Sequence, residues 1–282
     1  MDFFRRKTAK KTEPKSGCGF EGYVVSDVGS ARSNNEDNYV IDTYMNLSDG
    51  DRSECGLIAP KGGKNGWHLA GVFDGMGGGE KGEVAAHETA EIFLDTFRGF
   101  RRGVSAALVE QNLRAAFLQA NNRIVDLQQQ DRVFGTTGTV VATDGRNMKI
   151  FHLGDSRAYL LRNGELFQLT RDQTLAQMKL DAGLYEPNDP KVEVDKHKLT
   201  EYIGRDWTRE NLRPVEGQWM PVAPKDRLLL CSDGLYDMCS DRQIADILRS
   251  DLEENQIARE LVKAAIENGG IDNITCIVVT FS

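Results

Sequence analysis

Short runs of alternating hydrophobic and polar positions, together with short continuous apolar runs, account for much of the chain. The first pattern is typical of half-buried β-strands and the second of fully buried ones. They predict strands at residues 20–28, 39–43, 66–73, 137–143, 149–153, 157–162, 165–168, 227–231 and 274–281. The stretch 45–66 is polar and rich in Gly, Ser, Asp and Lys, so it predicts a surface loop, with or without a hairpin of its own.

Apolar residues recur at helical spacing in several other segments. Segments 80–97 and 104–130 carry long apolar stripes, which predict two helices packed as an antiparallel pair on a sheet. Segments 240–248 and 255–266 predict a second pair of helices, and a shorter pattern at 175–182 predicts a short helix. The stripes indicate core-facing surfaces rather than binding grooves.

Very short turns separate the four strands between residues 137 and 168. Because a parallel crossover needs about a dozen residues or more, links this short predict antiparallel pairing. Asn163-Gly164 is a strong hairpin signal. The link 29–38 between the first two strands is also rich in turn formers and predicts a hairpin-like connection. Segment 137–142 is apolar on both faces, which predicts an inner strand.

Residues 183–224 show no clear periodicity and contain Pro187, Pro190, Pro214 and Pro221. A long irregular insertion inside a compact domain is usually a functional lid or a mobile flap. We therefore expect this segment to act as a flap.

Composition narrows the class of protein. The chain has 282 residues, 40% hydrophobic and 28% charged, which fits one large globular domain or two small ones. Its net charge of -8 argues against nucleic acid as a partner. No apolar run approaches the roughly 18–20 residues of a membrane span, and no apolar segment follows Arg5-Arg6-Lys7 as in a signal peptide. We expect no transmembrane segment.

Cysteine usage and the basic beginning of the chain add two expectations. The five cysteines form no C-x-x-C pair, which argues against a disulfide scaffold or a zinc site and favours reduced thiols in a cytoplasmic protein. Residues 1–16 are basic and poor in apolar residues, so they predict a disordered tail. A short anchor is the alternative, with Phe3-Phe4 inserting and the basic residues facing anionic lipid or an acidic partner.

The candidate chemistry lies in acidic residues at the ends of predicted strands. Each of these residues stands beside Gly, Ser or Asn, and we expect no His or Cys to accompany them. They are Glu36 with Asp37, Asp74, Asp233 and Asp272, and Asp155 is a further candidate. Each site taken alone also fits an ordinary turn or a solvated loop.

Taken together, these carboxylates predict a metal site. Several carboxylates that converge without a cation repel one another. An all-oxygen ligand set selects hard cations such as Mg²⁺ or Mn²⁺ rather than zinc. Arg32 offers a planar fork of donors suited to phosphate. Two hard ions can activate a water molecule and clamp a phosphoryl group, so the residues predict metal-assisted hydrolysis of a phosphate ester.

Six motifs in a fixed order carry a resemblance to a known family. They are residues 30–37 (SARSNNED), 72–78 (VFDGMGG), 135–137 (GTT), 154–157 (GDSR), 232–235 (SDGL) and 272–275 (DNIT). The chain resembles the metal-dependent protein serine/threonine phosphatases (the PPM, or phosphatase 2C-like, family) in their bacterial form. The resemblance implies an α+β fold, with a central sandwich of two antiparallel β-sheets flanked by pairs of α-helices. It also implies one phosphatase domain over residues 17–282, with its flap at about 183–224.

The resemblance assigns metal ligands residue by residue. Asp74 resembles the carboxylate that bridges two metal ions, and Gly75 would offer its backbone carbonyl directly or through water. Asp233 and Asp272 resemble ligands of the first ion. Asp155, with Asp233, matches the position that holds a weaker third ion in bacterial members. The implied cofactors are two Mn²⁺ or Mg²⁺ ions, with a third in such members.

The remaining implied roles concern water and phosphate. Glu36 would hold the second ion through water, and Asp37 would orient metal-bound water. Arg32 resembles the phosphate-binding arginine. The motif 135–138 is taken as structural. Met76 stands where animal members of the family have a histidine that is proposed as the general acid. The proton for the leaving group must therefore come from another source.

The resemblance implies hydrolysis of phosphoserine and phosphothreonine in proteins by metal-activated water, reversing a bacterial Ser/Thr kinase. Residues 79–80 and 172–174 depart from patterns common in bacterial members, which affects the subfamily more than the activity. Two alternatives stay open: a catalytically weak or inactive binding module on the same fold, and a structural metal-binding protein. We expect a cytoplasmic monomer whose partners are phosphorylated proteins and a cognate kinase.

Overall fold

A computed structural model describes residues 18–47, 52–59, 65–77, 81–128, 133–206 and 212–282. The predicted basic tail (1–16) lies outside the described residues, as do Gly78, Gly79 and Glu80. The predictions made for those positions therefore remain predictions.

The first of two antiparallel sheets has six strands in the order β10-β9-β13-β14-β1-β4. The strands are β1 (Phe20–Asp27), β4 (Arg52–Ala59), β9 (Arg157–Arg162), β10 (Glu165–Gln168), β13 (Arg227–Cys231) and β14 (Ile274–Phe281). The prediction of a surface loop over 45–66 is wrong for β4, which pairs with the whole of β1. Because β4 is an edge strand, it keeps charged residues on its surface; Glu54 binds Tyr23 and Arg259.

The second sheet follows the order β11-β8-β7-β5-β2-β3, with β12 paired to β8 and β6 paired to β5. The strands are β2 (Asp37–Ile41), β3 (Tyr44–Met45), β5 (His68–Gly77), β6 (Phe134–Thr136), β7 (Gly138–Thr143), β8 (Asn147–Leu153), β11 (Val215–Glu216) and β12 (Met220–Pro221). All residues of β7 are buried between β5 and β8, which confirms the predicted inner strand.

Two short links that predict hairpins instead cross between the sheets. The link from β1 to β2 joins the six-stranded sheet to the eight-stranded one, and so does the link from β8 to β9. The second crossing needs Gly154, whose φ is +102° and whose position would place a Cβ 2.6 Å from the Thr137 side chain. A short link reverses the chain, but it does not decide which sheet receives the next strand. The pairs β7–β8 and β9–β10 are antiparallel, as predicted.

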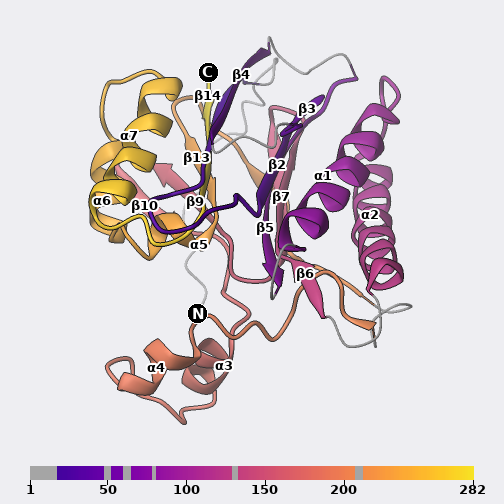
Figure 1. Ribbon diagram of the computed structural model, residues 1–282. Coiled ribbons are helices and arrows are strands. Elements are labelled where there is room, and N and C mark those ends of the chain that lie inside the picture. Colours follow the sequence, from indigo (N-terminus) through magenta and orange to yellow (C-terminus); the bar gives the residue numbers. More distant parts are fainter. Residues whose placement is uncertain (1–17, 48–51, 60–64, 78–80, 129–132, 207–211) are drawn as a thin grey trace.

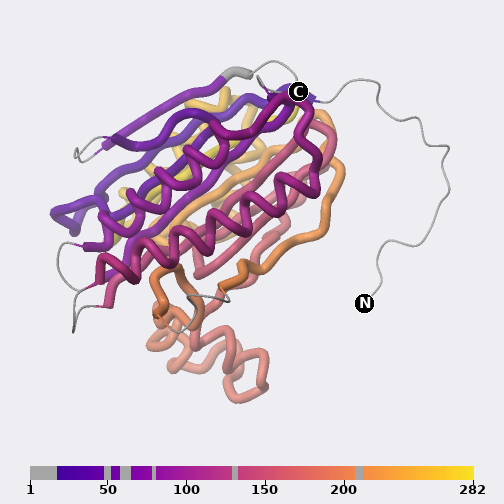
Figure 2. The backbone as a smooth tube through the Cα atoms, turned by 90° about the vertical axis from the view of Figure 1, so that its right-hand side faces the viewer, coloured from indigo at the N-terminus to yellow at the C-terminus, as the bar shows by residue number. Residues whose placement is uncertain are grey.

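A pair of helices covers the outer face of each sheet, which gives four layers (Figure 1). The pair α1 (Gly82–Arg98) and α2 (Ala106–Leu127) lies over the eight-stranded sheet, as Figure 2 shows from the side. The Phe93 ring lies between the rings of Phe73 and Phe117, with centroids 5.3 and 4.9 Å away. This core joins the sheet to both helices, and the predicted antiparallel pair is confirmed.

The other outer layer contains α6 (Asp241–Leu248) and α7 (Glu254–Glu267), with the short α5 (Asp233–Tyr236) after β13. A capping box at Ser240 starts α6. A separate hydrophobic core fills the space between the sheets. It includes Val24 and Leu230 of one sheet and Val72 and Val141 of the other. The predicted α+β sandwich of two antiparallel sheets flanked by helix pairs is confirmed.

A small helical unit of α3 (Leu175–Asp181) and α4 (Pro190–Asp195) projects from one end of the sandwich (Figure 1). Buried Asp195 holds the unit together, because its carboxylate accepts hydrogen bonds from Lys179 (2.6 Å), Tyr185 (2.9 Å) and Lys198 (2.8 Å). The segment expected to be irregular therefore contains α4, and its later part returns along β8 as β11 and β12. A flap role for this segment stays a prediction.

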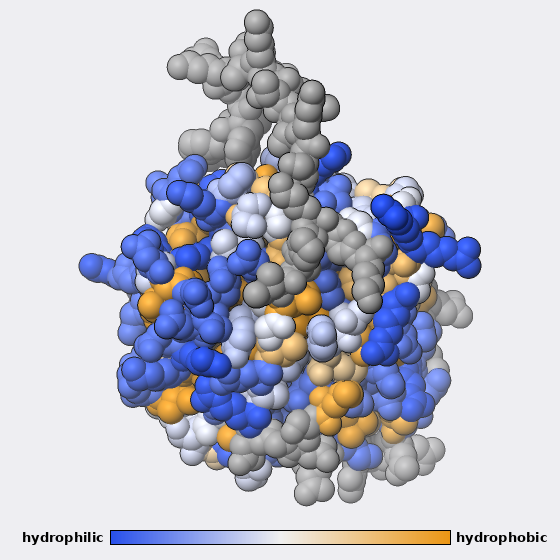
Figure 3. Space-filling view, turned by 90° about the horizontal axis from the view of Figure 1, so that it is seen from above, coloured by the Kyte–Doolittle hydropathy of each residue, from blue (hydrophilic) through white to orange (hydrophobic). Residues whose placement is uncertain are grey.

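The opposite end of the sandwich carries mostly hydrophilic side chains, and apolar residues form small separate groups among the atoms coloured in Figure 3. Within the described part of the chain, no helix combines the length and the apolar character that crossing a membrane requires.

Candidate metal and phosphate site

Asp74 lies where β5 changes its partner strand. Up to Val72 the strand pairs with β7, and from Gly75 it pairs with β6. The prediction that the strand stops at Asp74 is therefore wrong, since β5 continues to Gly77. Thr137 fixes the Asp74 backbone from both sides: its hydroxyl accepts from the Asp74 N–H, and its own N–H donates to the Asp74 carbonyl, both at 2.9 Å. The 135–138 motif thus holds Asp74 in place.

Gly75 brings three chain segments into contact. A Cβ at this position would lie 2.3 Å from the Gly82 carbonyl oxygen and 2.4 Å from the Glu36 carbonyl oxygen, so only glycine fits. The Gly75 N–H donates to the Glu36 carbonyl at 3.1 Å. This close approach sets Glu36 beside Asp74, and on β2 the next residue, Asp37, pairs directly with Asp74.

Asn273 clamps the loop that carries Arg32 and Glu36. Its side-chain Oδ1 accepts from the Glu36 N–H at 2.8 Å, and its side-chain Nδ2 donates to the backbone carbonyls of Val28 (3.0 Å) and Asn34 (2.9 Å). Asp272, the preceding residue, is thereby carried to the same place. One side chain next to β14 therefore ties the 28–36 loop to Asp272.

The end of β13 contributes Asp233 and a support for Asp37. Ser232 donates its hydroxyl to the Asp37 carboxylate at 2.7 Å, and its N–H donates to the Thr275 carbonyl at 3.0 Å. Asp233 follows as the first residue of α5. Sequence reasoning did not single out Ser232, Asn273 or Thr137 for these contacts, although all three belong to the quoted motifs.

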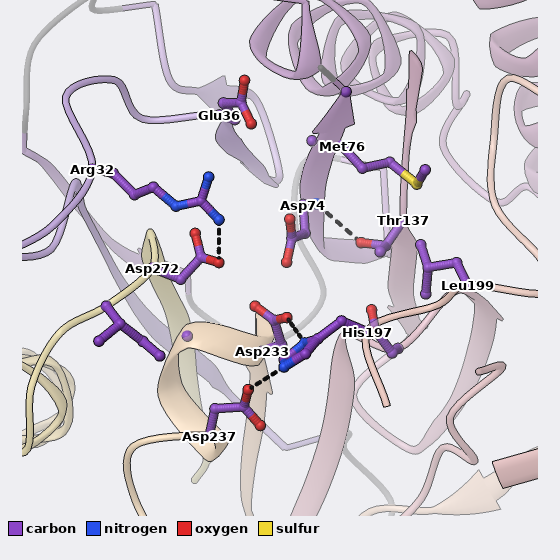
Figure 4. Close-up of a pocket in the computed structure, with 15 residues that line it drawn as sticks. Arg32, Glu36, Asp74, Met76, Thr137, His197, Leu199, Asp233, Asp237 and Asp272 are labelled. Carbon is purple, nitrogen blue, oxygen red and sulfur yellow. Dashed lines mark hydrogen bonds and ion pairs between the residues drawn. The ribbon is translucent and has the colours of Figure 1, made fainter. Parts of the chain in front are cut away.

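These segments enclose a cleft of about 430 Å³, whose lining residues are drawn in Figure 4. The cleft lies at the end of the sandwich that carries α3 and α4, since His197 and Leu199 from the loop after α4 also line it. Its lining includes seven residues that the sequence predicted: Arg32, Glu36, Asp74, Gly75, Asp155, Asp233 and Asp272. Asp37 does not line the cleft; it is 3% exposed and lies beneath it. The structure thus brings together all the predicted site residues, with Asp37 one layer deeper.

Burial and mutual repulsion raise the pKa values of several of these carboxyl groups. Burial and then Asp37 raise the pKa of Asp74, and burial and then Asp233 raise that of Asp155. Burial raises the pKa of Asp37 to about 7, even though the hydroxyls of Ser232 and Thr275 oppose the rise. Carboxylates buried this close together are stabilised by binding either a proton or a cation from solution. Their all-oxygen donors fit hard divalent ions.

Among the described residues, Arg32 and His197 bring nitrogen donors to the cleft. Arg32 donates to the Asp272 carboxylate at 2.7 Å, a hydrogen bond that raises the pKa of the guanidinium; the side chain is half exposed. His197 enters from the loop after α4, with Nδ1 3.4 Å from Asp233 Oδ2 and Nε2 3.4 Å from Asp237 Oδ2. The hydrogen bond to Asp233 raises the pKa of His197.

His197 and Asp237 are site residues that sequence reasoning missed. The expectation that no histidine accompanies the carboxylates is wrong, because His197 contacts Asp233 (Figure 4). Asp237 caps the C-terminal end of α5, one helical turn after Asp233, a spacing that could have suggested it. His197 lies between two lysines in the predicted flap and had no such signal.

The protein is therefore a four-layer α+β sandwich, and its candidate site is a carboxylate-lined cleft at one end of the sheets. Residues 23–179 and 223–274 match the sequence profile of the family described as Protein phosphatase 2C. A relative named as a protein phosphatase is also 30% identical over 92% of this chain. The chain belongs to the protein phosphatase 2C family.

Two relatives and one solved structure show how far the likeness extends. Serine/threonine protein phosphatase PstP of Mycobacterium tuberculosis is 33% identical over 233 residues, which are 80% of this chain and 43% of PstP. Protein phosphatase PhpP of Streptococcus pneumoniae is 30% identical over 266 residues, 92% of this chain and 96% of PhpP. A crystal structure of the PstP catalytic domain in complex with two manganese ions has a TM-score of 0.71 and 29% identity, covering 93% of this chain and 99% of that one. The chain spans less than half the length of PstP and nearly all of PhpP.

Proposed function

We propose that this protein is a metal-dependent protein serine/threonine phosphatase. The observation that carries the proposal is the cleft, in which Asp74, Asp233 and Asp272 converge with Arg32. Family membership and the names of PstP and PhpP support the same reaction. A binding module without activity is less favoured, because every predicted ligand is present and lies in or under the cleft.

Glu36, Asp74, the Gly75 carbonyl, Asp233 and Asp272 would hold two divalent ions. When bound, such ions neutralise phosphoryl charge and supply a nucleophilic water at neutral pH. The manganese ions in the PstP structure support Mn²⁺, and Mg²⁺ is the alternative. Asp155, with Asp233, would hold a third and weaker ion.

The chain's own groups divide the remaining work. Arg32 stands at the cleft with its guanidinium half exposed, and it would bind the substrate phosphate by paired hydrogen bonds. Asp37, buried and oriented by Ser232, would accept a hydrogen bond from water above it. Met76 lines the cleft and carries no proton to donate to the leaving group. The unit of α3 and α4 would act as the flap that governs access.

The substrates would be proteins phosphorylated on serine or threonine by a cognate bacterial kinase. We further propose a cytoplasmic monomer. The thiols of Cys55, Cys231, Cys239 and Cys276 are free, which agrees with a reducing compartment.

One assay tests this function. The protein is incubated with a phosphothreonine peptide and with p-nitrophenyl phosphate, in Mn²⁺ or Mg²⁺, with and without a chelator. We expect turnover that the chelator abolishes and that Asp233→Asn removes. Asp251→Asn, a change at an exposed position outside the cleft, is the matched control and should leave turnover intact. Absence of metal-dependent turnover on both substrates contradicts the proposal.

A further inference from the structure

Glu83 lies beside Glu36, and the proposed reaction does not use it. It belongs to the first turn of α1, directly after Gly82. A Cβ on Gly82 would lie 2.8 Å from Cδ and 2.9 Å from Oε2 of Glu36. The start of α1 is therefore pressed against the Glu36 carboxylate, and Glu83 follows one residue later.

One carboxylate oxygen of Glu83, Oε2, is buried and has no hydrogen-bond partner in the part of the chain that the structure describes. The nearest lysine in the sequence, Lys81, points elsewhere, with its ammonium 5.5 Å from the centre of the Phe134 ring. A buried carboxylate oxygen without a donor is unfavourable. This oxygen lies beside Glu36, a predicted metal ligand, so a cation bound at Glu36 would offset the cost of burying it.

The surroundings of Glu36 show that the two carboxylates act on each other. Burial contributes most to the raised pKa of Glu36, and the charge of Glu83 comes second, with Asp272 adding to it. Arg32 and a hydrogen bond from the Gly82 backbone lower this pKa, and they do not cancel the rise. Glu36 and Glu83 therefore repel each other, and an added cation would turn the repulsion into shared attraction.

We propose that Glu83 is a positioning residue of the metal site, one that strengthens divalent-cation binding on the Glu36 side. The inference rests on the metal site of the proposed function. Glu83 is not among the residues that line the cleft, so it acts through its charge on Glu36. It supplies negative charge behind the ligand. Groups of this kind change metal affinity by about 10–100-fold.

The test measures Mn²⁺ binding directly, by titration calorimetry on the full chain. Glu83→Gln keeps the shape of the side chain and removes its charge. We expect it to weaken Mn²⁺ binding about 10-fold. The matched control is Glu91→Gln, an exposed position on the same helix, which should leave the affinity unchanged. Wild-type protein that binds no Mn²⁺ overturns the proposed function and this inference together. Wild-type binding with equal affinity in Glu83→Gln overturns this inference alone.

Thermal unfolding without metal gives a second readout that separates positioning from a structural role. Since Glu83→Gln removes the repulsion with Glu36, we expect a higher melting temperature in the presence of a chelator. A residue that only supports the fold would lower it. The double variant Glu36→Gln/Glu83→Gln should gain less than the sum of the two single changes, because both relieve the same repulsion. Additive gains, or a lower melting temperature for Glu83→Gln, would overturn the proposal.

Discussion

Two clusters of carboxylates in this molecule use the same residue types to opposite effect. On the outer face of the eight-stranded sheet, Lys149 contacts Glu110 at 3.2 Å and Glu216 at 2.8 Å, and Arg114 pairs with both glutamates. The hydrogen bond from Arg114 lowers the pKa of Glu216 to about 2. In the cleft, by contrast, burial and neighbouring acids raise the pKa values of Asp74 and Asp155.

The difference lies in where the neutralising charge comes from. The outer cluster carries its own cations, so its charges are balanced when the chain folds, and the cluster ties α2 to β8 and β11. Among the described residues, the cleft has more carboxylates than cationic partners, so their charge must be balanced by protons or by ions from solution. A balanced cluster contributes to stability, whereas an unbalanced one stores repulsion that a ligand relieves.

The largest expected effect comes from removing the central cleft carboxylate. Asp74→Asn should lower kcat/KM by about 10³-fold or more, on the order of 4 kcal/mol of transition-state stabilisation. It should leave the metal-free protein as stable as the wild type or more stable, because one of several repelling charges is gone. Phosphate release and chelator-treated thermal unfolding measure the two quantities. An Asp74→Asn variant that keeps its activity and is less stable than the wild type would contradict the contrast drawn between the cleft and the outer cluster.

A smaller loss is expected at the phosphate-binding position. Arg32→Ala should raise KM for phosphate esters, since charge-assisted hydrogen bonds contribute about 1.5–3 kcal/mol, roughly 10- to 100-fold. Arg32→Lys keeps the charge and loses the planar fork, so part of the increase should remain. Steady-state kinetics on p-nitrophenyl phosphate measure this. An unchanged KM in Arg32→Ala would exclude the assigned role.

The outer cluster should respond in the opposite sense to the cleft. Lys149 is 7% exposed, and Lys149→Met leaves Arg114 as the remaining cationic partner of Glu110 and Glu216 in the described part of the chain, beside the hydrogen bond that the Trp219 indole donates to Glu110. We expect a loss of roughly 2 kcal/mol in the free energy of unfolding. Activity at a temperature where the variant is folded should change less than twofold, a margin of about 0.4 kcal/mol. Urea unfolding and the phosphatase assay provide the two values; strong loss of activity without loss of stability would show that the outer cluster serves the cleft.

The last prediction concerns pH. Because the folded pKa of Asp37 is about 7, above its unfolded value, its contribution to stability is present at low pH and is lost as pH rises from about 4 to 7. For Glu216, with a folded pKa of about 2, the contribution is constant above its unfolded pKa and is lost only in acid. Chelator-treated protein should therefore melt at a lower temperature at pH 7.5 than at pH 5.5. Asp37→Asn should reduce this dependence, and Glu216→Gln should not.

Much of the fold could be predicted from hydrophobic periodicity, because its core strands and both helix pairs bury continuous apolar faces. Strand β4 escaped prediction for a different reason: as an edge strand it carries Arg52, Glu54 and Gly56, and its apolar run is confined to its last three residues. The crossing at 154–156 escaped because a short turn limits direction and says nothing about the sheet that receives the chain.

The convergence of the cleft residues could not come from spacing alone. Glu36, Asp74, Asp233 and Asp272 lie far apart in the sequence, and only the ordered motifs of a family indicated that they meet. Their metal roles remain predictions, although the structure places all four at one cleft. His197 escaped because no local pattern marks it; it reaches Asp233 only through the packing of the α3–α4 unit.

The position of β14 has a consequence for synthesis. This strand lies between β13 and β1 in the middle of its sheet, yet the ribosome makes it after the other five strands. Asp272 and Asn273 arrive with it, so the clamp on the Arg32 loop cannot form earlier. A growing chain that contains both helices of the first pair, and even β13, still lacks the central strand of this sheet and one of the proposed metal ligands. The proposed phosphatase activity would therefore require translation to have passed β14.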